Sequence, residues 1–90
     1  MNLADLKQLR LSLLRHLENA AGRRFGLGAA VLLQHVRSEG AAAELADVQA
    51  ELDYLRDKGC VEMKADLISP HLSGWRITAA GRDYLAALQG

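Results

Sequence analysis

The chain has 90 residues, which is enough for one domain with a single hydrophobic core. Because 50% of its residues are hydrophobic and only 4% are aromatic, that core must consist mainly of leucine, alanine and valine. This composition is typical of a globular protein and excludes a disordered chain. Eleven basic residues balance eleven acidic ones, so the total charge favours neither nucleic acid nor a membrane surface as a partner.

Charge distribution and cysteine content narrow the class of protein further. Residues 1–24 hold five basic against two acidic side chains, a net charge of +3, whereas residues 25–59 hold three basic against six acidic, a net charge of −3. Cys60 is the only cysteine, so no disulfide forms within the chain, which fits a reducing compartment. The first residues mix charges with leucines, unlike a signal peptide or a membrane span. We therefore expect a cytoplasmic protein without a membrane partner.

The first segment is predicted to be a helix by the spacing of its leucines. They recur at steps of one, three and four residues, and about 100° of rotation per residue places them on one helical face. These leucines are Leu3, Leu6, Leu9, Leu13, Leu14 and Leu17. Asn2 is the expected N-cap, and Gly22 is expected to end the helix. Leu11 lies off the stripe, as an exposed leucine or as a contact with a partner.

Two further helices are expected before residue 60. The stretch "FGLG" at residues 25–28 breaks the first pattern and holds either a short strand or a loop. The second and third apolar faces consist of Ala29, Leu32, Leu33 and Val36, and of Leu45, Val48, Leu52 and Leu55. Both sets follow the helical period. Gly40 and Gly59 are expected to end these helices, because glycine readily adopts the left-handed conformation common at helix C-termini.

After residue 59 the pattern changes from the helical period to the alternation of a strand. Apolar and polar residues alternate over residues 61–67, and again around Trp75 and Ile77, on either side of the turn-rich "ISPHLSG". These two segments predict a β-hairpin. Thr78 is expected to cap a last helix. One face of that helix consists of Gly81, Tyr84, Leu85 and Leu88.

The order of these elements predicts an α+β, mainly helical fold of the winged helix-turn-helix type. Three helices are followed by a two-stranded β-hairpin, the wing, and then by a C-terminal helix, in a single winged-helix domain over residues 1–90. "LDYLRDKGCVEM" at residues 52–63 resembles the end of a recognition helix that leads into the first strand of a wing. "WRITAAGRDYL" at residues 75–85 resembles the end of many bacterial winged-helix regulators.

A closer resemblance combines the first and third helices. "LRLSLLRHL" at residues 9–17, together with "VQAELDYLRDKGCVEM" at residues 48–63, resembles a small winged-helix family encoded by Mu-like phages and prophages and often labelled regulator-like. The resemblance implies a winged helix of the ArsR and MarR type and a phage or prophage context. The match supplies fold and genomic context more than activity; with that fold and context, we expect a DNA-binding protein that regulates transcription and acts as a dimer.

The third helix is acidic for a helix that is expected to enter DNA. With its aliphatic residues turned inward, its outward face is expected to consist of Glu44, Asp47, Ala50, Glu51, Tyr54 and Lys58. Carboxylates on that face would repel a duplex, because much DNA affinity comes from Lys and Arg side chains that neutralise phosphates. Acidic residues near a helix N-terminus also stabilise the helix dipole, which accounts for Glu44 and Asp47 without any functional role.

Candidate DNA contacts therefore come from the wing and from basic residues that flank the helices. Basic side chains of a wing hold the phosphate backbone or enter a minor groove, and Gln49 is able to reach an adenine edge. The predicted DNA-binding residues are Arg23, Arg24, Arg37, Gln49, Lys64, His71 and Arg76. The alternative for these side chains is an ordinary solvated surface. Double-stranded DNA is the first expected partner.

A protein-interaction module is the competing hypothesis. In that case the acidic third helix meets another protein, with Tyr54 as an aromatic anchor, although Tyr54 could equally pack against the hairpin. A homodimer formed through the first and last helices is also expected, since small domains are commonly stabilised by association. Burial of Leu85 and Leu88 in the core is the simpler alternative. The predicted interface residues are Leu11, Glu51, Tyr54, Tyr84 and Leu88.

No catalytic, metal or cofactor site is expected. His16, His35 and His71 are scattered along the chain, and no nucleophile and base occur at a known spacing. "GLGAAVLL" lacks the third glycine of a dinucleotide-binding fingerprint. One cysteine and dispersed histidines do not form a metal site. Cys60 is expected to pack beside the hairpin as a small apolar residue, and Trp75 to be the main aromatic side chain of the core.

Overall fold

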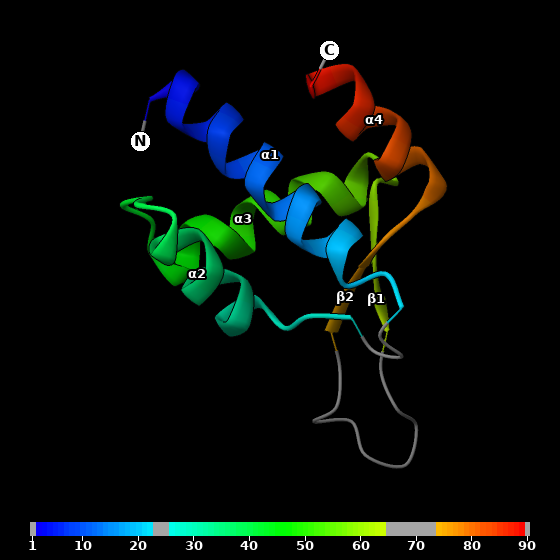
Figure 1. The fold of residues 1–90 in the computed structure, drawn as a ribbon, viewed down its shortest axis with the longest axis horizontal. Coiled ribbons are helices and arrows are strands. Elements are labelled where there is room, and N and C mark those ends of the chain that lie inside the picture. Colours follow the sequence, from blue (N-terminus) through cyan, green and yellow to red (C-terminus); the bar gives the residue numbers. More distant parts are fainter. Residues whose placement is uncertain (1, 23–25, 65–73, 90) are drawn as a thin grey trace.

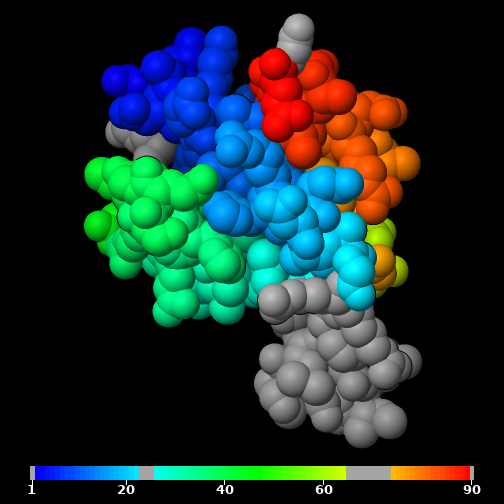
Figure 2. Space-filling model, in the orientation of Figure 1, coloured from blue at the N-terminus to red at the C-terminus, as the bar shows by residue number. Residues whose placement is uncertain are grey.

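The computed structural model describes residues 2–22, 26–64 and 74–89. Within these ranges the chain is mainly helical and has a small two-stranded antiparallel sheet, which is compatible with the expected α+β class. The elements are α1 (Leu3–Asn19), α2 (Ala29–Ser38), α3 (Leu45–Asp57), β1 (Val61–Lys64), β2 (Gly74–Ile77) and α4 (Ala79–Gln89). Helix α1 is the central element, with α4 on one side and α2 on the other (Figures 1 and 2).

Helix α1 begins as predicted but ends earlier than predicted. The Asn2 side chain accepts a hydrogen bond of 2.9 Å from the backbone N–H of Asp5, so the predicted N-cap is confirmed. The helix ends at Asn19, before Gly22. Leu3 is 69% exposed, because the first turn of α1 extends beyond the helices that cover the rest of the leucine stripe (Figure 1). The leucines of α1 that are buried are Leu9, Leu13, Leu14 and Leu17.

Glycines end α2 and α3, as the sequence predicts. Gly40 has a φ of 94° and Gly59 a φ of 77°, a backbone region that side chains with a Cβ rarely adopt. Helix α3 begins with a capping box, in which the backbone N–H of Glu44 donates to the Asp47 carboxylate at 2.9 Å. The inward position predicted for Leu45 is wrong. Leu45 is 39% exposed because it is the first residue of α3, before the helix meets the core.

The hairpin pairs Val61 with Ile77 and Met63 with Trp75. The stretch before α2 pairs with β2 at the edge of the hairpin through one isolated bridge. In this bridge Leu27 and Trp75 exchange backbone hydrogen bonds of 3.0 and 2.8 Å. Of the short strand or loop predicted for "FGLG", the structure shows a loop with one isolated bridge at Leu27. The predicted continuation of the first strand over residues 65–67 lies outside the described residues.

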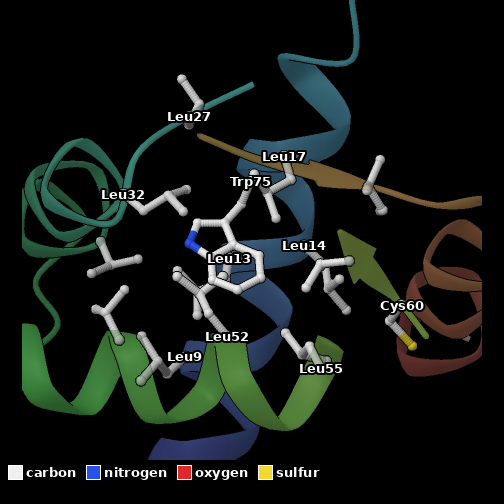
Figure 3. Packing of buried hydrophobic residues seen from close by; sticks show 14 of the residues in the cluster. Leu9, Leu13, Leu14, Leu17, Leu27, Leu32, Leu52, Leu55, Cys60 and Trp75 are labelled. Atoms are coloured by element: carbon white, nitrogen blue, oxygen red, sulfur yellow. The ribbon is translucent and has the colours of Figure 1, made fainter. Parts of the chain in front are cut away.

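Trp75 lies inside the core, which confirms its predicted role. Its indole ring packs among leucines from the helices, including Leu13 and Leu32, and only 6% of Trp75 is exposed (Figure 3). Cys60 is 3% exposed and belongs to the same core, also as predicted. Burial raises the pKa of the Cys60 thiol, so this cysteine behaves as a small apolar side chain. Trp75 and Cys60 therefore both have structural roles.

Thr78 connects the hairpin to α4. Its hydroxyl oxygen accepts from the backbone N–H of Gly81 at 3.0 Å, which confirms the predicted cap, and its hydroxyl donates to the carbonyl oxygen of Gly59 at 2.6 Å. Gly81 lies directly against the backbone that follows α3. A Cβ at this position would be 2.0 Å from the carbonyl oxygen of Cys60. The absence of a side chain at Gly81 thus sets how closely α4 approaches the end of α3.

Replacing Gly81 by alanine is expected to destabilise the fold by about 1–3 kcal/mol, because the added methyl group forces α4 away from the Cys60 carbonyl. The measurement is the free energy of unfolding from urea titration, followed by circular dichroism. Gly22→Ala is the matched control, since a Cβ there meets nothing within 4 Å. Equal unfolding midpoints for the two variants would contradict the proposed contact.

Candidate functional site

A shallow groove of about 380 Å³ lies between α3, the start of α2 and the hairpin. It is lined by Gly28, Ala29, Gln49, Asp53, Arg56, Met63, Gly74 and Trp75. Gln49 is exposed, so its amide is available to a ligand that covers the groove. The contact with DNA predicted for Gln49 stays a prediction. Arg56 is an additional basic residue that sequence reasoning did not select, although it is one turn after Asp53 on the same helix.

The two described basic residues of the hairpin lie on its other face. Side chains alternate along a strand, so Val61, Met63, Trp75 and Ile77 share one face of the hairpin. Val61, Trp75 and Ile77 are buried there, whereas Met63 is 49% exposed at the groove, so the inward position predicted for Met63 is wrong. Lys64 and Arg76 therefore project from the opposite face, together with Glu62. The Lys64 ammonium is 3.5 Å from the Glu62 carboxylate. Lys64 and Arg76 thus project from the hairpin face opposite to the one that borders Gln49.

Arg37 has a structural role in the connection between α2 and α3. Its guanidinium donates to the carbonyl oxygen of Ala43 at 2.9 Å and to the Glu44 carboxylate at 3.0 Å. It therefore holds the start of α3 against the end of α2, and the prediction of a free phosphate contact at Arg37 does not fit this geometry. The predicted contacts at Arg23, Arg24 and His71 lie outside the described residues.

Glu51 is not on the outward face of α3, so this sequence prediction is wrong. The residue is only 6% exposed, and its carboxylate accepts two hydrogen bonds from the Arg10 guanidinium, at 2.9 and 3.3 Å. The hydrogen bond to Glu51 raises the pKa of Arg10 further above its ordinary value. Burial of a carboxylate is tolerated here because a bidentate arginine satisfies it. Arg10 is 41 residues away in sequence, so no local pattern indicates the pair.

The other carboxylates of α3 also have partners within the protein. Glu44 pairs with Arg37, and the Arg56 guanidinium is 3.6 Å from Asp53 and 3.8 Å from Asp57. Asp47 accepts the backbone N–H in the capping box described above. These exposed pairs contribute little stability, about 0.2–1 kcal/mol each. They nevertheless reduce the negative potential that the acidic composition of α3 suggests.

Two tyrosines meet around the Arg10–Glu51 pair where α1, α3 and α4 come together. The Arg10 guanidinium lies 4.5 Å from the ring centre of Tyr54 and donates to the Tyr84 hydroxyl at 3.3 Å. The Lys58 ammonium is 5.4 Å from the ring centre of Tyr54 and 5.7 Å from that of Tyr84. We call Arg10, Glu51, Tyr54, Lys58 and Tyr84 the tyrosine seam.

Three of the predicted protein-interface residues, Glu51, Tyr54 and Tyr84, therefore meet in the tyrosine seam. Of the two positions predicted for Tyr54, exposed or packed against the hairpin, the structure shows the first. Tyr54 is 41% exposed and its ring packs on Arg10. Leu11 and Leu88 are half-buried and pack against the core. Each therefore contributes to the core with one part of its side chain and leaves the other part exposed. Leu85 is buried, as the simpler of the two predictions had it.

A second polar contact joins α1 to the end of α2. The Glu39 carboxylate accepts from the Ser12 hydroxyl and lies 2.8 Å from Nε2 of His16. The His16 ring stacks on that of His35, with ring centres 4.7 Å apart. The hydrogen bonds from Ser12 and His16 lower the pKa of Glu39. An open cavity of about 710 Å³ beside this contact is lined mainly by α1 and by the connection between α2 and α3.

Comparisons with protein-family models, curated proteins and solved structures found no match to this chain. None of the described helices combines the length and apolar character needed to cross a membrane. Within residues 2–22, 26–64 and 74–89, no group of three or more His, Cys, Asp or Glu side chains is placed to hold a metal ion.

Glu51→Gln is expected to lower the free energy of unfolding by about 2–4 kcal/mol, because it leaves the half-buried Arg10 guanidinium without its counter-charge. The matched control is Glu18→Gln, which breaks the exposed pair with Arg82 and is expected to cost less than about 1 kcal/mol. Both values are measured by chemical denaturation. Equal losses in the two variants would show that burial does not distinguish the two pairs.

Glu39 is expected to make stability depend on pH in the acidic range. Its pKa is lowered from an ordinary value of 4.5, so the folded state favours the carboxylate. That contribution is present above pH 4.5 and is lost as the pH falls through the lowered pKa. Unfolding titrations between about pH 3 and pH 7 should show a smaller acid loss for Glu39→Gln than for the parent chain. An unchanged profile would contradict this assignment.

Proposed function

We propose that this chain is a small winged-helix protein of phage or prophage context that binds double-stranded DNA and regulates transcription. In this proposal α2 and α3 are the helix-turn-helix and the hairpin is the wing. The arrangement supports it, because α3 leads directly into β1 and its exposed side borders the hairpin at the groove (Figure 1). The start of α2 borders the same groove. These are the elements that approach a duplex in the winged-helix class.

The observation that carries the proposal is the engagement of the α3 carboxylates by cations and backbone groups. Glu51 is buried against Arg10, and Arg56 neutralises part of the charge of Asp53 and Asp57. The repulsion expected between an acidic helix and phosphate is therefore weaker than the sequence suggests. Gln49 is the exposed polar residue of α3 in the groove that is suited to a base edge.

The hairpin leads the binding in this proposal. Lys64 and Arg76 are the described hairpin cations able to reach phosphates. Because they project from the hairpin face opposite the groove, the hairpin lies edge-on to the duplex in this proposal, and α3 lies beside the duplex without entering it deeply. Few phosphate contacts imply weak binding, with a dissociation constant on the order of micromolar at low salt. Two contacts imply a slope of about −2 in a plot of log K against log salt concentration.

The test is a titration of the chain against random-sequence duplex DNA at several salt concentrations. Lys64→Ala combined with Arg76→Ala is expected to weaken binding at least about tenfold and to bring the salt slope close to zero. Lys7→Ala combined with Arg15→Ala removes the same number of exposed charges from α1 and is the matched control. Absence of binding at about 20 mM salt would reject DNA binding.

A second candidate function is a winged-helix protein-interaction module that does not bind DNA. It is favoured by the meeting of Glu51, Tyr54 and Tyr84 in the tyrosine seam, since clustered aromatic side chains commonly anchor protein interfaces. Burial of Glu51 changes its role in this hypothesis. Its carboxylate binds Arg10 inside the tyrosine seam and is not accessible to a partner. The titration above separates the two candidates.

A further inference from the structure

Met63 is a large apolar side chain that the fold leaves half uncovered. It pairs with Trp75 across the hairpin and lies on the same face, yet Met63 is 49% exposed and Trp75 only 6%. The two differ because Trp75 packs among the leucines of the core, whereas Met63 is on the outer strand β1 and borders the groove (Figure 3). Packing in the core therefore does not account for a methionine at this position.

The groove surrounds Met63 with a lining of mixed character. Ala29 is a second apolar side chain there, and the exposed Gln49 carries an amide with both a donor and an acceptor. Such a lining suits a ligand that presents a donor and an acceptor next to an apolar group. In the major groove of DNA, an A·T pair presents all three, which are N6 and N7 of adenine and the C5-methyl group of thymine.

The cation of the groove is less suited to a G·C pair. Guanine is read most often by arginine, through two hydrogen bonds from the guanidinium. The Arg56 guanidinium is already 3.6 Å from the Asp53 carboxylate and 3.8 Å from that of Asp57. Cytosine, moreover, carries no methyl group at C5. The chemistry of the groove therefore favours an A·T pair.

We propose that Met63 contacts the C5-methyl group of a thymine and thereby gives this chain a preference for DNA that carries that group. This inference rests on the DNA binding proposed above. Methionine is unbranched and polarizable, so its thioether adapts to a methyl group, and the contact removes apolar surface of both from water. Met63 and Gln49 have long side chains, so they reach base edges although α3 does not enter the duplex deeply. Ala46 and Ala50 share the exposed face of α3 with Gln49, so small side chains leave room for the bases.

The experiment compares two duplexes of the same alternating A and T sequence, one of which has uracil in place of every thymine. Uracil keeps the hydrogen-bonding groups of thymine and lacks only its methyl group. At about 20 mM salt the parent chain is expected to bind the thymine duplex at least about threefold more tightly, since roughly one methyl group per site leaves water. Met63→Ala is expected to bind the two duplexes equally. Leu3→Ala shortens an exposed apolar side chain on α1 and is the matched control, which should keep the preference.

Circular dichroism of each variant checks that it is folded. Equal binding of the two duplexes by the parent chain would overturn this inference and leave DNA binding intact, whereas no binding to either would reject the proposed function as well. A preference that survives Met63→Ala would show that another residue senses the methyl group, and the assignment to Met63 would fail. A G·C duplex with and without 5-methylcytosine tests the other source of the same group. A gain there as large as the gain from thymine would overturn the assignment to thymine.

Discussion

The ion pair between Arg10 and Glu51 is the interaction on which the arrangement of the helices around the tyrosine seam depends. It connects α1 to α3 and, through the Tyr84 hydroxyl, to α4. A carboxylate that is 6% exposed persists only with a well-oriented counter-charge, so the position of α1 and the rotation of α3 are coupled through this contact. The surrounding leucines contribute more hydrophobic free energy, but they tolerate small rotations that a bidentate pair does not.

Helix α3 contributes to two surfaces. On one side Gln49 and Arg56 border the groove with the hairpin, where we propose that a duplex lies. On the other side Tyr54 and Lys58 belong to the tyrosine seam.

Sequence reasoning predicted the elements well and the site only in part. The Asn2 and Thr78 caps and the glycine at position 59 depend on neighbours within four residues, and all three are confirmed. The leucine stripe of α1 is confirmed from Leu9 to Leu17, whereas Leu3 is exposed. The inward position of Leu45 and the outward position of Glu51 are wrong. Periodicity places a residue on one side of a helix, but it does not show which other helix covers that side.

The sequence by itself determined the helical stripes, the glycine ends of α2 and α3, the presence of the hairpin and the buried cysteine, because short-range geometry and hydrophobic spacing specify them. Only the tertiary structure decided which charges are exposed. Arg10 neutralises Glu51 across 41 residues, and Arg37 is engaged by the start of α3. Electrostatic partners are chosen by distance in space, and packing brings together side chains that no sequence interval connects.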